Sequence, residues 1–158
     1  MALAHLVGAH AEALSIIARA QSGDYAEWPS WLPLAVDLVS QLPGEDALRE
    51  AGDALAGDVA PKTSPYVKAQ SARVGALLAH RSGDAERAAD HWSTAIAVVG
   101  EAGMAFHVAA LRLELFEHVG ERAVSAEDLR AAVGTFTGLR ATPWLQRARR
   151  AAEVATLR

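Results

Sequence analysis

The sequence of 158 residues contains no cysteine, and its only lysines are Lys62 and Lys68. Without cysteine the chain can form neither disulfide bonds nor thiolate metal sites. No uncharged apolar run approaches the ~20 residues that a membrane-spanning helix requires. The N-terminus also lacks the basic start and the cleavage site of a secretory signal peptide. We therefore expect a cytoplasmic protein with no membrane segment.

The charge balance argues against direct binding of nucleic acid. The formal net charge is −4, whereas a general binder of polyanions normally carries a strong basic excess. The one locally basic segment contains Arg147, Arg149 and Arg150. One interpretation is a contact with nucleic acid or an acidic partner. Because Leu145 and Ala148 supply the apolar stripe of this segment, we favour Arg149 and Arg150 as the solvent-facing side of a helix.

The residues that are abundant favour helices throughout. Alanine, leucine, arginine and glutamate are strong helix formers, and the β-branched residues are scattered rather than alternating. Ser64, Asp84 and Ser125 are typical N-cap residues, and Gly83 is typical of a helix end. The sequence therefore predicts an all-α protein of about eight helices. The predicted units are a partial hairpin at 1–21, hairpins at 28–57, 64–100 and 102–139, and a terminal capping helix at 142–158.

One spacing recurs along the chain. A glycine, a small residue, a large apolar residue and another small residue follow at steps of five, four and three, as Gly83, Ala88, Trp92, Ala95 and as Gly8, Ala13, Ile17, Ala20. This pattern resembles the second helix of a tetratricopeptide repeat. The resemblance implies antiparallel helical hairpins stacked as a tetratricopeptide-like superhelix.

A second resemblance concerns residues 64–153. The segment Phe136, Leu139, Ala141, Pro143, Trp144, Arg147, Ala148 resembles the closing segment of the helical-repeat region in bacterial multidomain ATPase regulators. These regulators include LuxR-type activators and ATPase-linked nucleotide cyclases. The resemblance implies a non-enzymatic protein-interaction or regulatory module of a bacterial signalling or transcription regulator. Its partner would be another protein or an attached regulatory domain.

The same resemblance implies where a ligand would bind. In a tetratricopeptide-like stack, the first helix of each hairpin lines the concave surface. Carried over by register, the candidate groove residues are Trp31, Gln70, Arg73, Leu77, His107 and Glu114, with His80 as a further candidate. Such a mixture suits a peptide or, as the alternative function, a small effector molecule. The opposing interpretation is that these are ordinary solvent-facing side chains.

Aromatic residues are few, yet Tyr25, Trp28 and Trp31 lie close together. We interpret Tyr25 and Trp28 as plugs over a joint between hairpins, with Trp31 alone reaching the groove. Trp92 and Trp144 occupy packing positions, and we expect both in the core.

Motifs for chemistry are missing. The sequence has no glycine-rich phosphate loop and no Gly-x-Ser-x-Gly motif. Glu114 and His118 are four residues apart, whereas helical-bundle metal sites use a spacing of three, and the pair does not recur in a second helix. We therefore expect no enzymatic activity, no cofactor and no metal ion.

The repeat register also bears on where the chain begins. If Gly8 occupies the turn inside a hairpin, the sequence starts in the middle of a repeat. One interpretation is a fragment of a longer regulator. The alternative is a complete small protein in which a homodimer partner covers the first helix.

Overall fold

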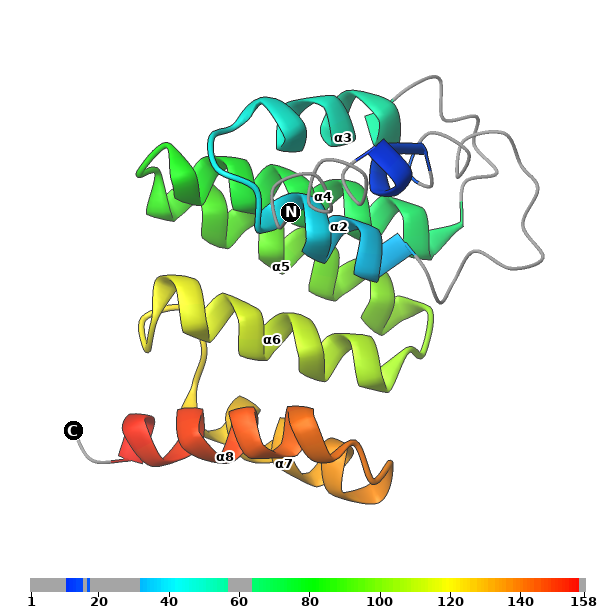
Figure 1. Ribbon diagram of the computed structural model, residues 1–158. Helices are drawn as coiled ribbons and strands as arrows, with labels where there is room; N and C mark the ends of the chain where they lie inside the picture. The colour runs from blue at the N-terminus through cyan, green and yellow to red at the C-terminus, as the bar shows by residue number, and fades with distance from the viewer. Residues whose placement is uncertain (1–10, 16, 18–31, 57–63, 157–158) are drawn as a thin grey trace, which may run out of the picture.

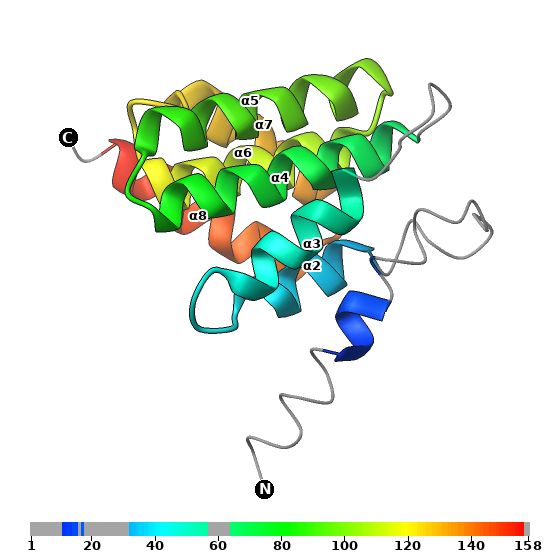
Figure 2. The same ribbon diagram turned by 90° about the horizontal axis from the view of Figure 1, so that it is seen from above.

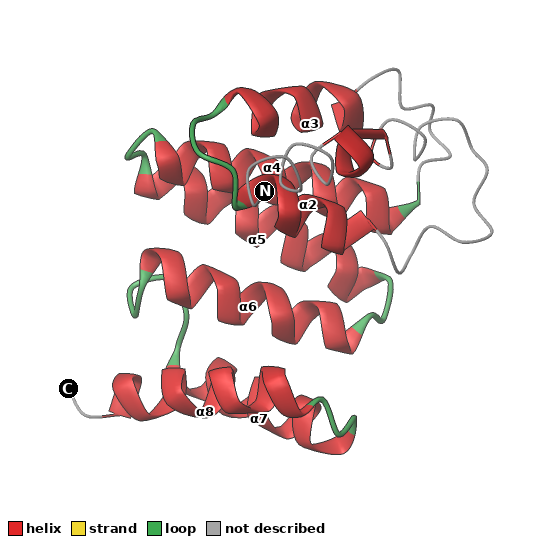
Figure 3. Cartoon of the chain, in the orientation of Figure 1, coloured by secondary structure: helices red, strands yellow, loops and turns green. Residues whose placement is uncertain are grey.

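The computed structural model describes residues 11–15, 17, 32–56 and 64–156 (Figure 1). All regular secondary structure in these ranges is α-helical, and no strand occurs among them (Figure 3). The predicted all-α fold is therefore confirmed. The superhelical arrangement of the hairpins stays a prediction.

Seven labelled helices come after a short helical segment at 11–15 and 17. They are α2 (Leu32–Ser40), α3 (Asp46–Ala56), α4 (Pro65–Arg81), α5 (Ala85–Glu101), α6 (Ala105–Val119), α7 (Ala126–Gly138) and α8 (Thr142–Thr156). Each helix packs against the next along the chain, and α2 also contacts α4 as α6 contacts α8. In Figure 1, α2–α5 form the upper part of the molecule, α6 lies below them, and α7 and α8 lie at the bottom. Figure 2, seen from above, shows α2 and α3 to one side of α4 and α5.

The predicted helix starts are confirmed by their caps. The side-chain oxygens of Ser64, Asp84 and Ser125 accept the backbone N–H groups of Tyr66, Arg87 and Asp128 at 3.3, 3.0 and 3.1 Å. Each bond satisfies one N–H that the helix itself leaves without a partner. Local side-chain chemistry therefore fixes where α4, α5 and α7 begin.

Three of the turns between helices share one backbone geometry. Gly83, Gly103 and Arg140 have φ values of 82°, 71° and 53°, in the left-handed region. In each turn the next residue donates its N–H to a carbonyl five positions back, as Asp84 to Ala79, Met104 to Val99 and Ala141 to Phe136. These are Schellman ends, which normally place glycine at the left-handed position. Arg140 takes that conformation without being glycine.

The core contains the residues of the recurring spacing. Ala13, Ile17, Ala88, Trp92 and Ala95 are all at most 1% exposed. The predicted burial of Trp92 is thus confirmed, since small residues beside it let neighbouring helices approach closely.

Trp144 differs from its predicted place in the core, because it is only half-buried. Its ring contacts Phe106 and Phe136, with centroids 5.6 and 5.8 Å away, while the rest of the ring lines a cavity. Helix α8 packs mainly against α7 and α6.

Candidate functional site

A cavity of about 520 Å³ lies between α2, α4, α6 and α8, and all of its lining residues come from these four helices or the turn after α2. We call it the groove. Its charged and titratable lining includes Asp37 of α2, Arg73 and His80 of α4, Glu114 and His118 of α6, and Arg147 of α8. Alternate helices of the chain thus face one common space, while α3, α5 and α7 contribute none of its lining.

A smaller cavity of about 70 Å³, which we call the side cavity, adjoins the groove. The two share the side chains of Asp37, Arg73, Glu114 and Trp144. The side cavity is also lined by Gln70, His107 and Phe106. The shared residues therefore form a common wall between the two spaces.

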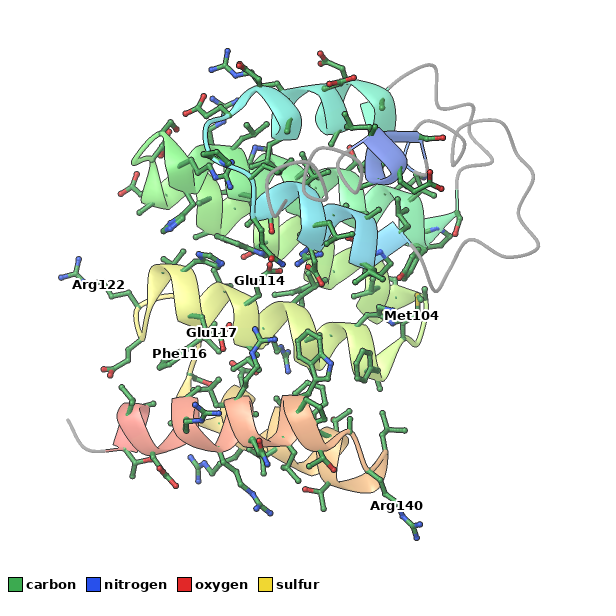
Figure 4. All side chains as sticks on the ribbon, viewed as in Figure 1. Met104, Glu114, Phe116, Glu117, Arg122 and Arg140 are labelled. Carbon is green, nitrogen blue, oxygen red and sulfur yellow. The ribbon has the colours of Figure 1, made fainter. Side chains whose placement is uncertain are left out.

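Arg73 connects the other polar residues of this wall through hydrogen bonds and ion pairs. Its Nε and Nη2 donate to Oε2 and Oε1 of Glu114, each at 2.7 Å, in a bidentate ion pair. Nη2 also donates to Oδ1 of Asp37, and Nη1 lies 3.4 Å from Oε1 of Gln70. The side chains of Arg73 and Glu114 are only 10% and 12% exposed, whereas that of Asp37 is 39% exposed. Figure 4 shows Glu114 on the side of α6 that faces α4.

Both members of the buried pair are charged. Burial by itself lowers the pKa of Arg73, but the charges and hydrogen bonds of Glu114 and Asp37 reverse this and raise it above its ordinary value. Burial likewise raises the pKa of Glu114, and Arg73 together with a 3.3 Å hydrogen bond from Trp92 Nε1 lowers it below its ordinary value. The ion pair thus compensates the loss of water around each group.

Two histidines meet at the other end of the groove. The ring of His118 stacks on Trp92, with centroids 5.1 Å apart, and His80 lies edge-on at 4.7 Å from His118. Neither imidazole forms a hydrogen bond or ion pair with another residue that the structure describes. Burial lowers the pKa of His118, and the neighbouring charges of Glu114 and Glu117 oppose this shift. The neutral ring is therefore the favoured form.

Two further arginines border the groove. Arg147 donates to both carboxylate oxygens of Glu117, at 2.6 and 3.2 Å, and its guanidinium lies 4.5 Å from the centroid of the Trp144 ring. Glu117 extends from α6 toward α8 in Figure 4. Arg81 donates to the backbone carbonyls of Ser40 and Gly44 and so fixes the end of α2.

The structure brings most of the sequence-predicted residues to these cavities. Arg73, Leu77, His80 and Glu114 line the groove, and Gln70 and His107 line the side cavity together with Arg73 and Glu114. Trp31 lies outside the described residues, as do Tyr25 and Trp28.

Several groove residues were not predicted from the sequence, namely Asp37, Arg81, Glu117, His118, Trp144 and Arg147. Spacing within one helix gives no signal for them, because their partners lie on other helices.

Comparison of the chain with protein-family models, with curated proteins and with solved structures finds no match. Across residues 11–15, 17, 32–56 and 64–156, no group of three or more histidine, cysteine, aspartate or glutamate side chains is arranged to hold a metal ion. Among the helices described, none combines the length and apolar character that crossing a membrane requires. Fold and site together define an all-helical protein with a groove between alternate helices, built around a buried ion pair.

Proposed function

We propose that this chain is a non-enzymatic module that binds a segment of a partner protein, or of an attached regulatory domain, in the groove. The observation that carries the proposal is that four alternate helices each contribute polar side chains to one common cavity. Its volume of about 520 Å³ lies within the ~300–1,000 Å³ of typical ligand sites.

The lining suits a peptide. Arginine, histidine and carboxylate groups alternate with Leu77 and Trp144 along the groove. A peptide offers both backbone polar groups and apolar side chains, so such a mixture can bind it at several points. The resemblance of residues 64–153 to helical-repeat regions of bacterial ATPase regulators supports a role in signalling or transcription.

The proposed mechanism is the display of a rigid surface. Arg73 ties α2, α4 and α6 together, so the groove keeps its shape before a partner arrives. A preorganised site loses less conformational entropy on binding. Binding would then couple to an attached ATPase, cyclase or DNA-binding unit through docking of rigid bodies.

A small effector molecule is the second candidate ligand. The side cavity favours it, because a recess of about 70 Å³ beside the larger space could hold one substituent of a compact ligand. A thermal-shift screen separates the two candidates. A stabilising metabolite whose effect disappears in Arg147→Glu would favour the effector.

The test of the proposed function uses two arginines of α8. Peptides selected from a displayed library on the wild-type protein should bind Arg147→Glu at least about tenfold more weakly, since the change places a negative charge against Glu117 in the groove. Arg149→Glu is the matched control, because Arg149 is exposed and does not line the groove. Equal binding by both variants would rule out the groove as the binding surface.

A further inference from the structure

The charges around the side cavity do not balance. Two carboxylates, Asp37 and Glu114, line it beside a single guanidinium, Arg73. The remaining titratable lining residue is His107, and burial lowers its pKa, so its neutral form is favoured. With both carboxylates ionised, the lining carries one negative charge in excess. The groove shares these three charged residues, and its further arginines, Arg81 and Arg147, donate hydrogen bonds to backbone carbonyls and to Glu117 rather than to Asp37.

The excess charge falls on Asp37. The oxygens of Glu114 accept three hydrogen bonds, two from Arg73 and one from Trp92. Asp37 accepts one, at Oδ1 from Arg73, and among the described residues Oδ2 accepts none. The Asp37 side chain is also 39% exposed against 12% for Glu114, so an incoming group can reach it.

The other walls suit a cation. Phe106 and Trp144 line the recess with aromatic rings, whose faces attract positive charge. Gln70, only 4% exposed, also lines it, and its amide oxygen faces Arg73. A carboxylate with a free oxygen and two aromatic rings therefore line one small space.

The size of the recess selects the group. Its volume of about 70 Å³ exceeds the ~10–15 Å³ that a cavity needs to hold one water molecule. An ammonium head group fits this space. Because the groove and the side cavity share Asp37 and Trp144, a chain carrying that head group can lie in the groove.

We propose that the side cavity is a subsite for a primary ammonium group, presented by a lysine side chain of the segment that binds in the groove. This inference rests on the proposed function, since the groove must hold the rest of the segment. Asp37 supplies the charge-assisted hydrogen bond through Oδ2, and Arg73 keeps its carboxylate in place through Oδ1. Trp144 and Phe106 enclose the methylene groups next to the nitrogen.

The test compares N-acetyl-lysine methylamide with N-acetyl-norleucine methylamide, which has a similar chain without the nitrogen. In an NMR titration of the isotope-labelled full chain, the lysine derivative should shift the Trp144 indole and Gln70 amide signals. We expect the norleucine derivative to bind at least about tenfold more weakly, as for the loss of a hydrogen bond to a charged group. Equal binding of the two derivatives would overturn the subsite.

Binding of the same two derivatives by Asp37 variants is the second test of the subsite. Asp37→Asn should weaken binding of the lysine derivative by about tenfold, and Asp37→Glu, which keeps the charge, should retain the preference for lysine over norleucine. Asp53→Asn is the matched control, because Asp53 is exposed on α3 and lines neither cavity. Circular dichroism verifies that each variant is folded. Unchanged binding in folded Asp37→Asn would contradict the proposal.

Titration with n-butylammonium distinguishes the two possible sources of an ammonium group, a lysine side chain of a peptide and a free amine. Weaker binding of butylammonium than of the lysine derivative supports a peptide source, whereas equal binding would overturn the lysine assignment and indicate a free amine. The two proposals can also fail separately. Selected peptides that require Arg147 but bind equally with norleucine in place of lysine would refute only the subsite. Binding of the lysine derivative without any Arg147-dependent peptide would refute only the proposed function.

Discussion

Arg73 on α4 and Glu114 on α6 form a bidentate ion pair with both nitrogen–oxygen distances at 2.7 Å, although 41 positions separate them in the sequence. The same guanidinium also donates to Asp37 on α2. One side chain thus connects three helices that are not consecutive in the chain. The groove depends on this contact for its shape, and the stability of the protein should depend on it too.

Replacing Glu114 with leucine leaves a buried guanidinium with only Asp37 as a charged partner. We expect Glu114→Leu to lower the free energy of unfolding by about 3–5 kcal/mol, the usual cost of breaking a buried ion pair. The double variant Arg73→Leu, Glu114→Leu should recover much of this loss, because no unpaired buried charge remains. Urea denaturation of the wild type, of the single variants Arg73→Leu and Glu114→Leu and of the double variant measures the coupling. Strictly additive effects would show that the two charges do not stabilise each other.

The pH dependence of stability should reflect the titration of His118. Burial lowers the pKa of His118 in the folded protein below the ~6.5 of an unfolded chain. The unfolded chain therefore binds protons more readily, and the free energy of unfolding should decrease as the pH falls below about 6.5. The pKa of Glu114 is also lowered, but by the ion pair with Arg73 and against the effect of burial. Its contribution therefore stabilises the fold above the ordinary carboxylate range and is lost only in more acidic solution.

His118→Phe tests this dependence while keeping a ring stacked on Trp92. Its free energy of unfolding should change less between about pH 7 and about pH 5.5 than that of the wild type. His107→Phe should reduce the same slope independently, since burial also lowers the pKa of His107, whose ring contacts Tyr66 rather than Trp92. A slope unaltered by either substitution would show that neither imidazole titrates in this range.

Replacing Arg140 with glycine should stabilise the protein. Its φ of 53° places an exposed side chain in the left-handed region, which costs a residue with a Cβ about 1–2 kcal/mol. Part of the gain is offset by the greater freedom of glycine in the unfolded chain, so Arg140→Gly should stabilise the protein by about 0.5–1 kcal/mol. Calorimetry should find a higher Tm, and Arg140→Ala, which keeps the Cβ, should show no such increase.

Two glycine-to-alanine changes should have opposite signs. A Cβ at Gly134 in α7 would meet no atom within 4 Å, so Gly134→Ala should stabilise the helix by about 1 kcal/mol. Gly83 has a φ of 82°, and Gly83→Ala should destabilise the α4–α5 turn by about 1–2 kcal/mol. Thermal unfolding of the two single variants compares them directly. Shifts in the same direction would mean that backbone conformation does not decide the outcome at one of these positions.

The helices could be predicted because local chemistry sets their ends. Ser64 and Asp84 bond to N–H groups two and three residues away, and Gly83 supplies a left-handed turn directly before Asp84. Such information lies within a short window of sequence. The burial of Trp92 could be predicted from spacing along one helix.

The site was only partly predictable, because its contacts join separate helices. Asp37 and Arg73 are 36 positions apart, and His80 meets His118 only through the packing of α4 beside α6. The prediction for Trp144 was wrong because a large apolar ring at a helical packing position suits a core equally well. Its half-buried state follows from the two cavities that it lines beside α2, α4 and α6, and spacing along one helix carries no information about those.

The oxygen Oε2 of Glu114 accepts hydrogen bonds from Arg73 and from the indole of Trp92, a fully buried residue of α5. A continuous chain of hydrogen bonds therefore runs from Asp37 at the groove through Arg73 and Glu114 to the buried indole of Trp92. A cation bound beside Asp37 would alter the hydrogen bonds that the Arg73 guanidinium donates to Glu114. The electric field at the Trp92 indole would change as a result. If the groove binds a ligand as proposed, the N–H resonance of the Trp92 indole should therefore report its occupancy without a label.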